Sequence, residues 1–496
     1  MPRRIIRGFK PLGLLVLSLV ISGCIATGGI EPKGSALSAD SLATDSAIQN
    51  AALAAHWPTA HWWRVYNDPQ LDRWIELAVL GSPSLAMAAA RVREAKAMAG
   101  MAESAESVQV QGTASLARHG WPSDQFYGPG ALADRHTWDN NASLGMRYAL
   151  DLWGRERSAS EQALDLAHMS AAEQRQAQLE LQENIVRAYI QFSLNFARLE
   201  IAKASLAQQQ QMLDLAQRRL KGGLGTHFEV SQAQATLPEI HRQIDELEEA
   251  ISLGRNQLAA LAGKGPGEGS TLQRPRLVLN SELKLPSALP AQLLGQRPDV
   301  VASQWRVAAQ AQGIDVAHAN FYPNVDLVAS LGYMATGGGM LAFLTGSKLS
   351  YTAGPALTLP MFDGGRLRAE LGRASAGYDL AVAHYNQTLV MALKSVSDQL
   401  IRRASLDKQQ VYAADSVASA RKTYDIALIA YQRGLTDYLS VLNAQTLLFR
   451  QQQVQQQVEA ARLTAYAGLV VALGGGLSAG DDVPAALAHV GSQVGH

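Results

Sequence analysis

Two stretches of this sequence are nearly the same, KGGLGTHFEVSQAQATL at residues 221–237 and QRGLTDYLSVLNAQTLL at residues 432–448. Gly434 follows Gly223 by 211 residues, and several Leu, Val, Ala and Gln positions in the two stretches keep that same offset. The chain has 496 residues, so the offset is almost half of its length. A repeat on this scale indicates that one large structural unit occurs twice.

Apolar residues recur every seven positions around each quoted stretch, for example at Ile185, Phe192, Leu199, Leu206, Leu213 and Leu220. This spacing is typical of long helices that pack side by side in a left-handed supercoil. We therefore expect helices at about 153–220 and 226–262, with counterparts at about 364–433 and 436–473. The first would be roughly 100 Å long, and Pro238 should bend the second.

Four shorter segments alternate apolar and polar residues, which predicts strands with one apolar face. They lie at about 107–118 and 139–151 in the first unit and at about 322–334 and 349–361 in the second. Each is long enough to cross an outer membrane. Four strands cannot close a barrel, and open edges are not tolerated in lipid, so closure requires several chains. Three chains would supply a barrel of twelve strands and a matching ring of twelve helical columns.

The predicted units span residues 61–263 and 291–474, each with a helix, two strands, a long helix, a turn and a last helix. The Gly- and Pro-rich segment 264–290 is interpreted as a linker between the units. Residues 475–496 are interpreted as a flexible C-terminal tail.

The N-terminus carries an export signal. Residues 1–23 contain four basic residues, a short apolar run and small residues, and Cys24, the only cysteine, follows. This pattern is typical of a secretory signal peptide and is too short for a membrane span. Residues 21–23 (Ile-Ser-Gly) resemble a bacterial lipobox, which predicts cleavage before Cys24, its acylation, and a lipidated tether over 24–60. In lipoproteins that this pattern resembles, Asp directly after the cysteine retains the protein at the inner membrane. Ile25 occupies that position here, which favours the outer membrane. For Cys24 itself, a buried core thiol is the alternative.

The composition and the absence of catalytic motifs argue against nucleic-acid binding and against enzyme activity. Lys and Arg number 43, Asp and Glu number 43, and only 17% of residues are charged, so nucleic acid is not an expected partner. The 11 His residues are scattered, and no HExxH, GxSxG or phosphate-loop motif occurs. We expect no enzyme activity, no metal site and no cofactor. A twelve-stranded barrel of this kind would make the protein a channel. The alternative function is a periplasmic coiled-coil lipoprotein, either a scaffold or an adaptor without a channel, but that function would leave the paired strands unexplained.

The sequence resembles TolC-like outer-membrane factors of the lipidated OprM/NodT type. The resemblance rests on five segments: HWWRVYNDPQLDRWIELAVLGSPSL (61–85), LDLWGR (150–155), RPDVVASQWRVAAQAQGIDVAHANFYPNVDL (297–327), PMFDGGRLRA (360–369) and YQRGLTDYLSVLNAQ (431–445). It implies a homotrimer, with a twelve-stranded β-barrel in the outer membrane of a Gram-negative bacterium and a twelve-helix periplasmic α-barrel. It also implies a duct of a tripartite efflux system that exports drugs or other small toxic compounds. The partners implied are an adaptor (membrane fusion) protein and an inner-membrane transporter of the resistance-nodulation-division type.

The resemblance also assigns roles to the two quoted turns, although plain helix–helix turns are the alternative. Adaptor contacts are expected at Gly223, Leu224, Gly225 and Thr226 and at Gly434, Leu435 and Thr436.

A periplasmic gate is expected just inside the second turn, at Tyr431, Leu439, Asn443 and Thr446. The family places Asp and Arg where this sequence has Asn443 and Thr446, so we expect a gate held by Leu439 and by neutral hydrogen bonds. For Tyr431 and Leu439, ordinary coiled-coil packing is the alternative.

Overall fold

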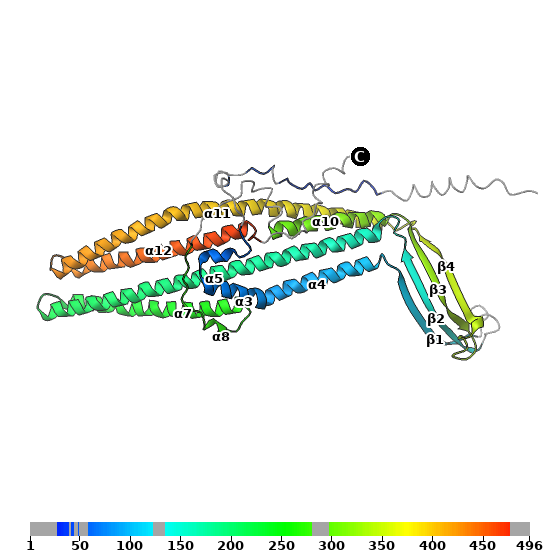
Figure 1. The fold of residues 1–496 in the computed structure, drawn as a ribbon, viewed down its shortest axis with the longest axis horizontal. Helices are drawn as coiled ribbons and strands as arrows, with labels where there is room; N and C mark the ends of the chain where they lie inside the picture. The colour runs from blue at the N-terminus through cyan, green and yellow to red at the C-terminus, as the bar shows by residue number, and fades with distance from the viewer. Residues whose placement is uncertain are drawn as a thin grey trace, which may run out of the picture.

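The computed structural model describes residues 27–38, 41–43, 48, 58–122, 134–279 and 297–476. The predicted signal peptide, Cys24 and nearly all of the predicted C-terminal tail lie outside the described residues. Long helices run side by side through most of the described chain, and a single four-stranded sheet stands at one end of them (Figure 1).

The two longest helices are α5 (Arg155–Lys221) and α11 (Arg366–Gln432), each of 67 residues. At 1.5 Å per residue, each is roughly 100 Å long. Helix α12 (Tyr438–Ala472) returns along α11 after a tight turn. The other end of the bundle therefore consists of hairpin tips, far from the sheet (Figure 1).

The chain returns along α5 in two pieces, α6 (His227–Ala235) and α7 (Leu237–Leu261). The interruption at Thr236 lies directly before the first turn of α7, which contains Pro238. A proline inside a helix removes one amide donor and clashes with the preceding turn, so the predicted bend takes the form of a break.

Two shorter helices, α4 (Pro83–Ser104) and α10 (Pro298–Ala319), flank α5 in the half of the bundle near the sheet. Both begin at proline, where the missing amide has no helical acceptor to lose. Across this half the helices lie in the order α4, α5, α10, α11.

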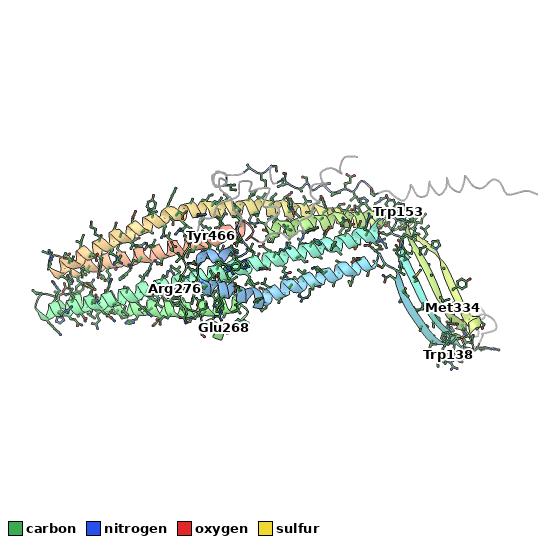
Figure 2. All side chains as sticks on the ribbon, in the orientation of Figure 1. Trp138, Trp153, Glu268, Arg276, Met334 and Tyr466 are labelled. Carbon is green, nitrogen blue, oxygen red and sulfur yellow. The ribbon has the colours of Figure 1, made fainter. Side chains whose placement is uncertain are left out.

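The largest core cluster lies midway along the bundle, where small elements pack against α5, α7 and α12. These elements are η2 (Trp62–Tyr66), α3 (Pro69–Gly81) and α8 (Pro266–Gly269). Figure 2 labels Tyr466, Arg276 and Glu268 in this region.

The predicted linker is in part packed structure. It contains α8, and Leu272 beyond it is completely buried in the central core. The amide of Arg276 donates to the buried carboxylate of Asp68, at 2.8 Å. The first half of the predicted linker 264–290 is therefore packed, because one apolar side chain and one buried acceptor hold it against the bundle.

The sheet has the order β1 (Gln109–Gly120), β2 (His136–Ala149), β3 (Asn324–Thr336) and β4 (Leu349–Thr358), with every pair antiparallel. A short turn of helix, η4 (Gly346–Lys348), precedes β4. Strands from the two repeated units meet at the β2–β3 pair, and β1 and β4 are the edges.

The two faces of the sheet differ in chemistry. One face is apolar and is not covered by the other residues that the structure describes. Its large side chains are Val110, Leu116, Leu144, Met146, Leu327, Leu331, Leu349, Tyr351 and Leu357. The other face carries the hydroxyl pair of Thr113 and Ser143 and the ion pair of Arg147 with Asp326 at 2.8 Å. A sheet that is apolar on one exposed face and polar on the other suits a wall between lipid and water.

Within the described parts of the chain, no single helix has the length and apolar composition needed to cross a membrane. One consecutive pair of helices, α3 and α4, bent by 41°, passes the length and composition test together.

Candidate functional site: the paired hairpin tips

The two quoted turns have the same backbone geometry. After α5, Gly223 adopts a φ of 72°, and the amide of Leu224 donates to the carbonyl of Arg219 at 2.8 Å. After α11, Gly434 adopts a φ of 75°, and the amide of Leu435 donates to the carbonyl of Ala430 at 2.9 Å. This is the Schellman ending of a helix, in which glycine takes the left-handed position at no steric cost. The repeated Gly-Leu pair is therefore required by the turn itself.

The helices that leave the turns are capped in similar ways. Thr226 accepts from the amide of Glu229 and Glu229 accepts from the amide of Thr226, which forms a complete capping box. Asp437 accepts from the amide and the hydroxyl of Ser440, and these hydrogen bonds lower the pKa of its carboxyl. Both caps satisfy amides at the start of a helix, which rigidifies the turn.

Each turn ends in an exposed apolar side chain. Leu224 is 74% exposed and Leu435 is 77% exposed, although in the Schellman motif the residue at this position often packs back on its own helix. Phe228, one turn further, is also 74% exposed. The tips therefore present apolar side chains on a backbone that is fixed by hydrogen bonds, which is suited to contact with another protein.

The structure separates the four residues expected at the gate. Leu439, Asn443 and Thr446 lie on one exposed face of α12, where Leu439 is 48% exposed. The Thr446 hydroxyl donates to the Leu442 carbonyl of its own helix, at 2.8 Å. Tyr431 is instead completely buried between the hairpins, in a cluster with Tyr438 and Val441. Tyr431 therefore does not share the face of the other three.

Arg219 joins the two hairpins. Its guanidinium lies 4.6 Å from the centre of the Tyr431 ring and donates to the Tyr431 carbonyl at 3.0 Å. The same group donates to the Leu224 carbonyl of its own turn at 3.3 Å. One side chain from α5 thus holds both turns, combining charge-assisted hydrogen bonds with a cation–π contact.

A second polar contact lies deeper between the same hairpins. Gln209 is buried on α5, and its amide nitrogen donates to the Ala233 carbonyl at 2.9 Å and to the Tyr438 hydroxyl at 2.8 Å. We call the pair Arg219 and Gln209, with the atoms that they bind, the hairpin tie.

Sequence reasoning missed the hairpin tie, although the repeat contains a signal for it. At the offset of 211, Arg219 corresponds to Ala430 and Gln209 to Ala420, while Tyr431 corresponds to Leu220. The tie therefore consists of residues at which the two units differ, and a search for what the units share passes over it.

A half-buried carboxyl group lies on α5 towards the sheet. The pKa of Asp165 is raised to about 6, mainly by burial and secondly by the negative charge of the nearby Glu161. Because the pKa of the folded state lies above the ordinary value of 3.8, the native state binds this proton more tightly than the unfolded state. The folded protein therefore loses stability as the pH rises from about 4 through about 6.

We expect Asp165→Asn to raise the melting temperature at neutral pH, because the amide removes the cost of ionising a half-buried acid. The difference from wild type should shrink as the pH falls towards about 4. Asp214→Asn, on the exposed side of the same helix, is the matched control. Thermal unfolding followed by circular dichroism tests this, and an equal gain at both pH values would contradict it.

Within the described residues, no three His, Cys, Asp or Glu side chains are grouped as metal ligands. The two-faced sheet and the hairpin tips form the two ends of the bundle (Figure 1).

Comparison with known proteins agrees with this arrangement. The family described as outer membrane efflux protein matches residues 74–264 and 289–475. The chain belongs to the outer membrane efflux protein family. A relative from Burkholderia cepacia, fusaric acid resistance protein FusA, is 46% identical over 438 residues, which cover 88% of this chain and 81% of FusA.

Other relatives and solved structures are also outer-membrane proteins. The multidrug resistance outer membrane protein MdtP of Escherichia coli is 29% identical over 84% of this chain and 86% of its own. The structure of the outer membrane protein VceC from Vibrio cholerae has a TM-score of 0.79 and 33% identity, covering 84% of this chain and 99% of VceC. The Campylobacter jejuni CmeC channel has a TM-score of 0.83 at 21% identity, so it supports the fold alone.

The predicted fold class is confirmed: this is a protomer of the TolC-like trimeric channels, in which a β-barrel continues into a helical barrel. The predicted location in the outer membrane and the general function as an efflux channel are confirmed as well. The family and the structural neighbours are channel proteins, not enzymes.

Proposed function

We propose that three copies of this efflux protein form an exit duct that leads from the periplasm to the exterior. The supporting observation is the sheet: among the described residues of the protomer, nothing covers its apolar face and no strand pairs with the outer edges of β1 and β4. In lipid these edges require partners. Pairing β1 of one copy with β4 of the next satisfies both edges and leaves the polar face, with Arg147 and Asp326, around a central passage.

The hairpin tips are proposed as the adaptor-binding end, and Leu224 and Leu435 as its main apolar contacts. Because both turns have the same geometry, a trimer would offer six similar sites around one rim. The adaptor and an inner-membrane transporter, of the resistance-nodulation-division type, complete the proposed pump.

The proposed cargo is small toxic compounds. Two relatives are named for resistance, one to fusaric acid and one to multiple drugs. The higher identity is to FusA, so a small aromatic acid of that class is the first compound to test.

Acylation of Cys24 is the proposed attachment to the membrane, in addition to the barrel. It is supported by the signal-like residues 1–23 and by the position of the only cysteine directly after them.

Purified protein in planar lipid bilayers tests the proposed channel. We expect heat-resistant trimers in detergent and stepwise ion currents, and deletion of the gene should sensitise cells to the exported compounds. A monomer without conductance would favour the alternative of a scaffold or an adaptor.

The gate is proposed at Leu439, Asn443 and Thr446, and its conductance should change little between about pH 5 and pH 8 or with divalent cations. The reason is that Asn443 and Thr446 carry no charge. Near them, burial raises the pKa of Tyr431 and of Tyr438, and hydrogen bonds lower that of Asp437, so none of the three titrates in this range. Single-channel recording across that range measures the effect, and a steep pH dependence would refute the neutral gate. Asn443→Asp should create sensitivity to divalent cations.

A further inference from the structure

The N-terminal segment 27–38 lies along α11 on the outside of the bundle, in the half near the sheet (Figure 1). Over these residues the predicted tether is therefore docked on α11. Two polar side chains of α11 hold the segment, and both bind its backbone.

Asp379 provides the first contact. Its Oδ1 accepts from the amide of Lys33 at 2.8 Å and from the amide of Gly34 at 2.7 Å. A carboxylate that binds two successive amides makes charge-assisted hydrogen bonds, which are stronger than neutral ones.

The contact with Asp379 explains why residue 34 is a glycine. A Cβ atom on Gly34 would lie 3.1 Å from Asp379 Oδ1 and 3.2 Å from the Cβ of Val382. The backbone therefore approaches α11 as closely as glycine permits, and a larger side chain would push the segment away.

Asn386 provides the second contact, two turns further along α11. Its Oδ1 accepts from the amide of Leu37 at 2.8 Å, and its Nδ2 donates to the carbonyl of Ser35 at 3.0 Å. An amide side chain that donates to and accepts from one peptide segment fixes the direction of that segment as well as its place.

The segment has a turn at Gly28 and Gly29, where φ is 73° and 70°, and continues without helix or strand up to residue 38. Gly28 lies beside Arg368, and Leu37 is bonded to Asn386. These two positions of α11 are separated by about 27 Å at 1.5 Å per residue. The stretch from Gly28 to Leu37 would span about 30 Å if it were fully extended, so the segment has little slack.

The end of the segment reaches the base of the sheet. Ile30 packs against a cluster that includes Leu367 and Leu371 from the first turns of α11, the element that follows β4. Gly28 follows Cys24 by four positions, a reach of at most about 14 Å. Met361 and Phe362, which is 94% exposed, lie in the connection between β4 and α11.

The base of the sheet has the character of a membrane boundary. Figure 2 shows Trp153 where the helices meet the sheet, and its indole donates to the Pro323 carbonyl at 2.9 Å while the ring stacks on Tyr322. Aromatic side chains with one polar atom concentrate at the surface of a bilayer.

We propose that residues 27–38 form a strap that fixes the position of the lipid anchor, with Asp379 and Asn386 as its positioning residues. The strap leads the chain to the start of α11, which follows the connection that contains Met361 and Phe362, and thereby confines the acyl chains on Cys24 to the bilayer beside the barrel. Without the strap, the chain from Cys24 to Pro58 could place the anchor anywhere within a radius of roughly 100 Å. This inference rests on the proposed acylation of Cys24.

Spin labels at Thr27→Cys and Phe362→Cys test the strap in the full acylated chain, in trimers with one labelled protomer. Acylation leaves no other free thiol, because Cys24 is the only cysteine. We expect a single narrow distance distribution, and its loss in Asp379→Ala/Asn386→Ala. Asp398→Ala, an exposed carboxylate further along α11 paired with Lys394, is the matched control and should leave the distribution narrow.

Mass spectrometry of the same protein separates the two hypotheses. Absence of the lipid mass at Cys24 would overturn the acylation and, with it, the anchoring role of the strap. Acylated protein with the same distance distribution in the double variant would overturn the strap alone. Hydrogen exchange at Lys33, Gly34 and Leu37 gives a readout without labels: these amides should be protected in wild type and should lose protection in the double variant.

Discussion

Arg219→Ala should increase the leak of the isolated channel. The guanidinium holds the Tyr431 carbonyl, the Tyr431 ring and the Leu224 carbonyl together, so its removal lowers the free energy needed to separate the two hairpins. Hydrogen bonds of a charged group contribute about 2 kcal/mol, which corresponds to a change of roughly 30-fold in the equilibrium between closed and open tips. Single-channel recording without adaptor measures the open probability directly.

Arg218→Ala is the matched control, because Arg218 is the exposed neighbour on the same helix end and carries the same charge. Arg219→Lys should have an intermediate effect, since an ammonium keeps the charge but cannot reproduce the planar contact with Tyr431. Equal open probabilities for wild type and Arg219→Ala would show that the hairpin tie does not restrain the tip.

Gly332→Ala should prevent assembly of the barrel. Gly332 lies in β3 opposite Ser143 of β2, and a Cβ atom there would lie less than 3.0 Å from the Ala142 carbonyl and from the Ser143 side chain. Because backbone atoms are involved, the strands must separate or shift in register, and a shift by one residue would turn apolar side chains to the polar face. We expect the yield of heat-resistant trimer in the outer membrane to fall several-fold or more.

Gly354→Ala provides the control for that loss. Gly354 lies in β4 on the same polar face, opposite Val328, and a Cβ atom there meets nothing within 4 Å. Its trimer yield should therefore match wild type on semi-native gels. A normal yield for Gly332→Ala would mean that the β2–β3 contact relaxes in the assembled barrel.

The strands show how far sequence alone reaches. The alternation through Val110, Leu144 and Leu331 predicts one apolar face, and the register places these side chains on the same face. The prediction works because the period of two is a property of each strand. The offset of 211 between Gly223 and Gly434 likewise predicts two equivalent turns, because a helix ending depends on a few neighbouring residues.

Tyr431 is a residue whose surroundings the sequence could not predict. Its place in the sequence fits both a gate residue and ordinary coiled-coil packing, and the structure buries it between the two hairpins. The deciding contact comes from Arg219, which is 212 residues away. A pattern confined to α11 and α12 contains no information about that partner.

The sequence by itself determined the repeat, the long helices, the two-faced strands and the glycine turns, because each depends on residues within a few turns or one strand pleat of one another. Only the tertiary structure decided the burial of Tyr431, the hairpin tie, the packing of the supposed linker and the docking of residues 27–38. These depend on contacts between distant segments: the amide of Lys33 and the carboxylate of Asp379 are 346 residues apart in the chain. Such a contact exists only after the bundle has placed α11 beside the N-terminus.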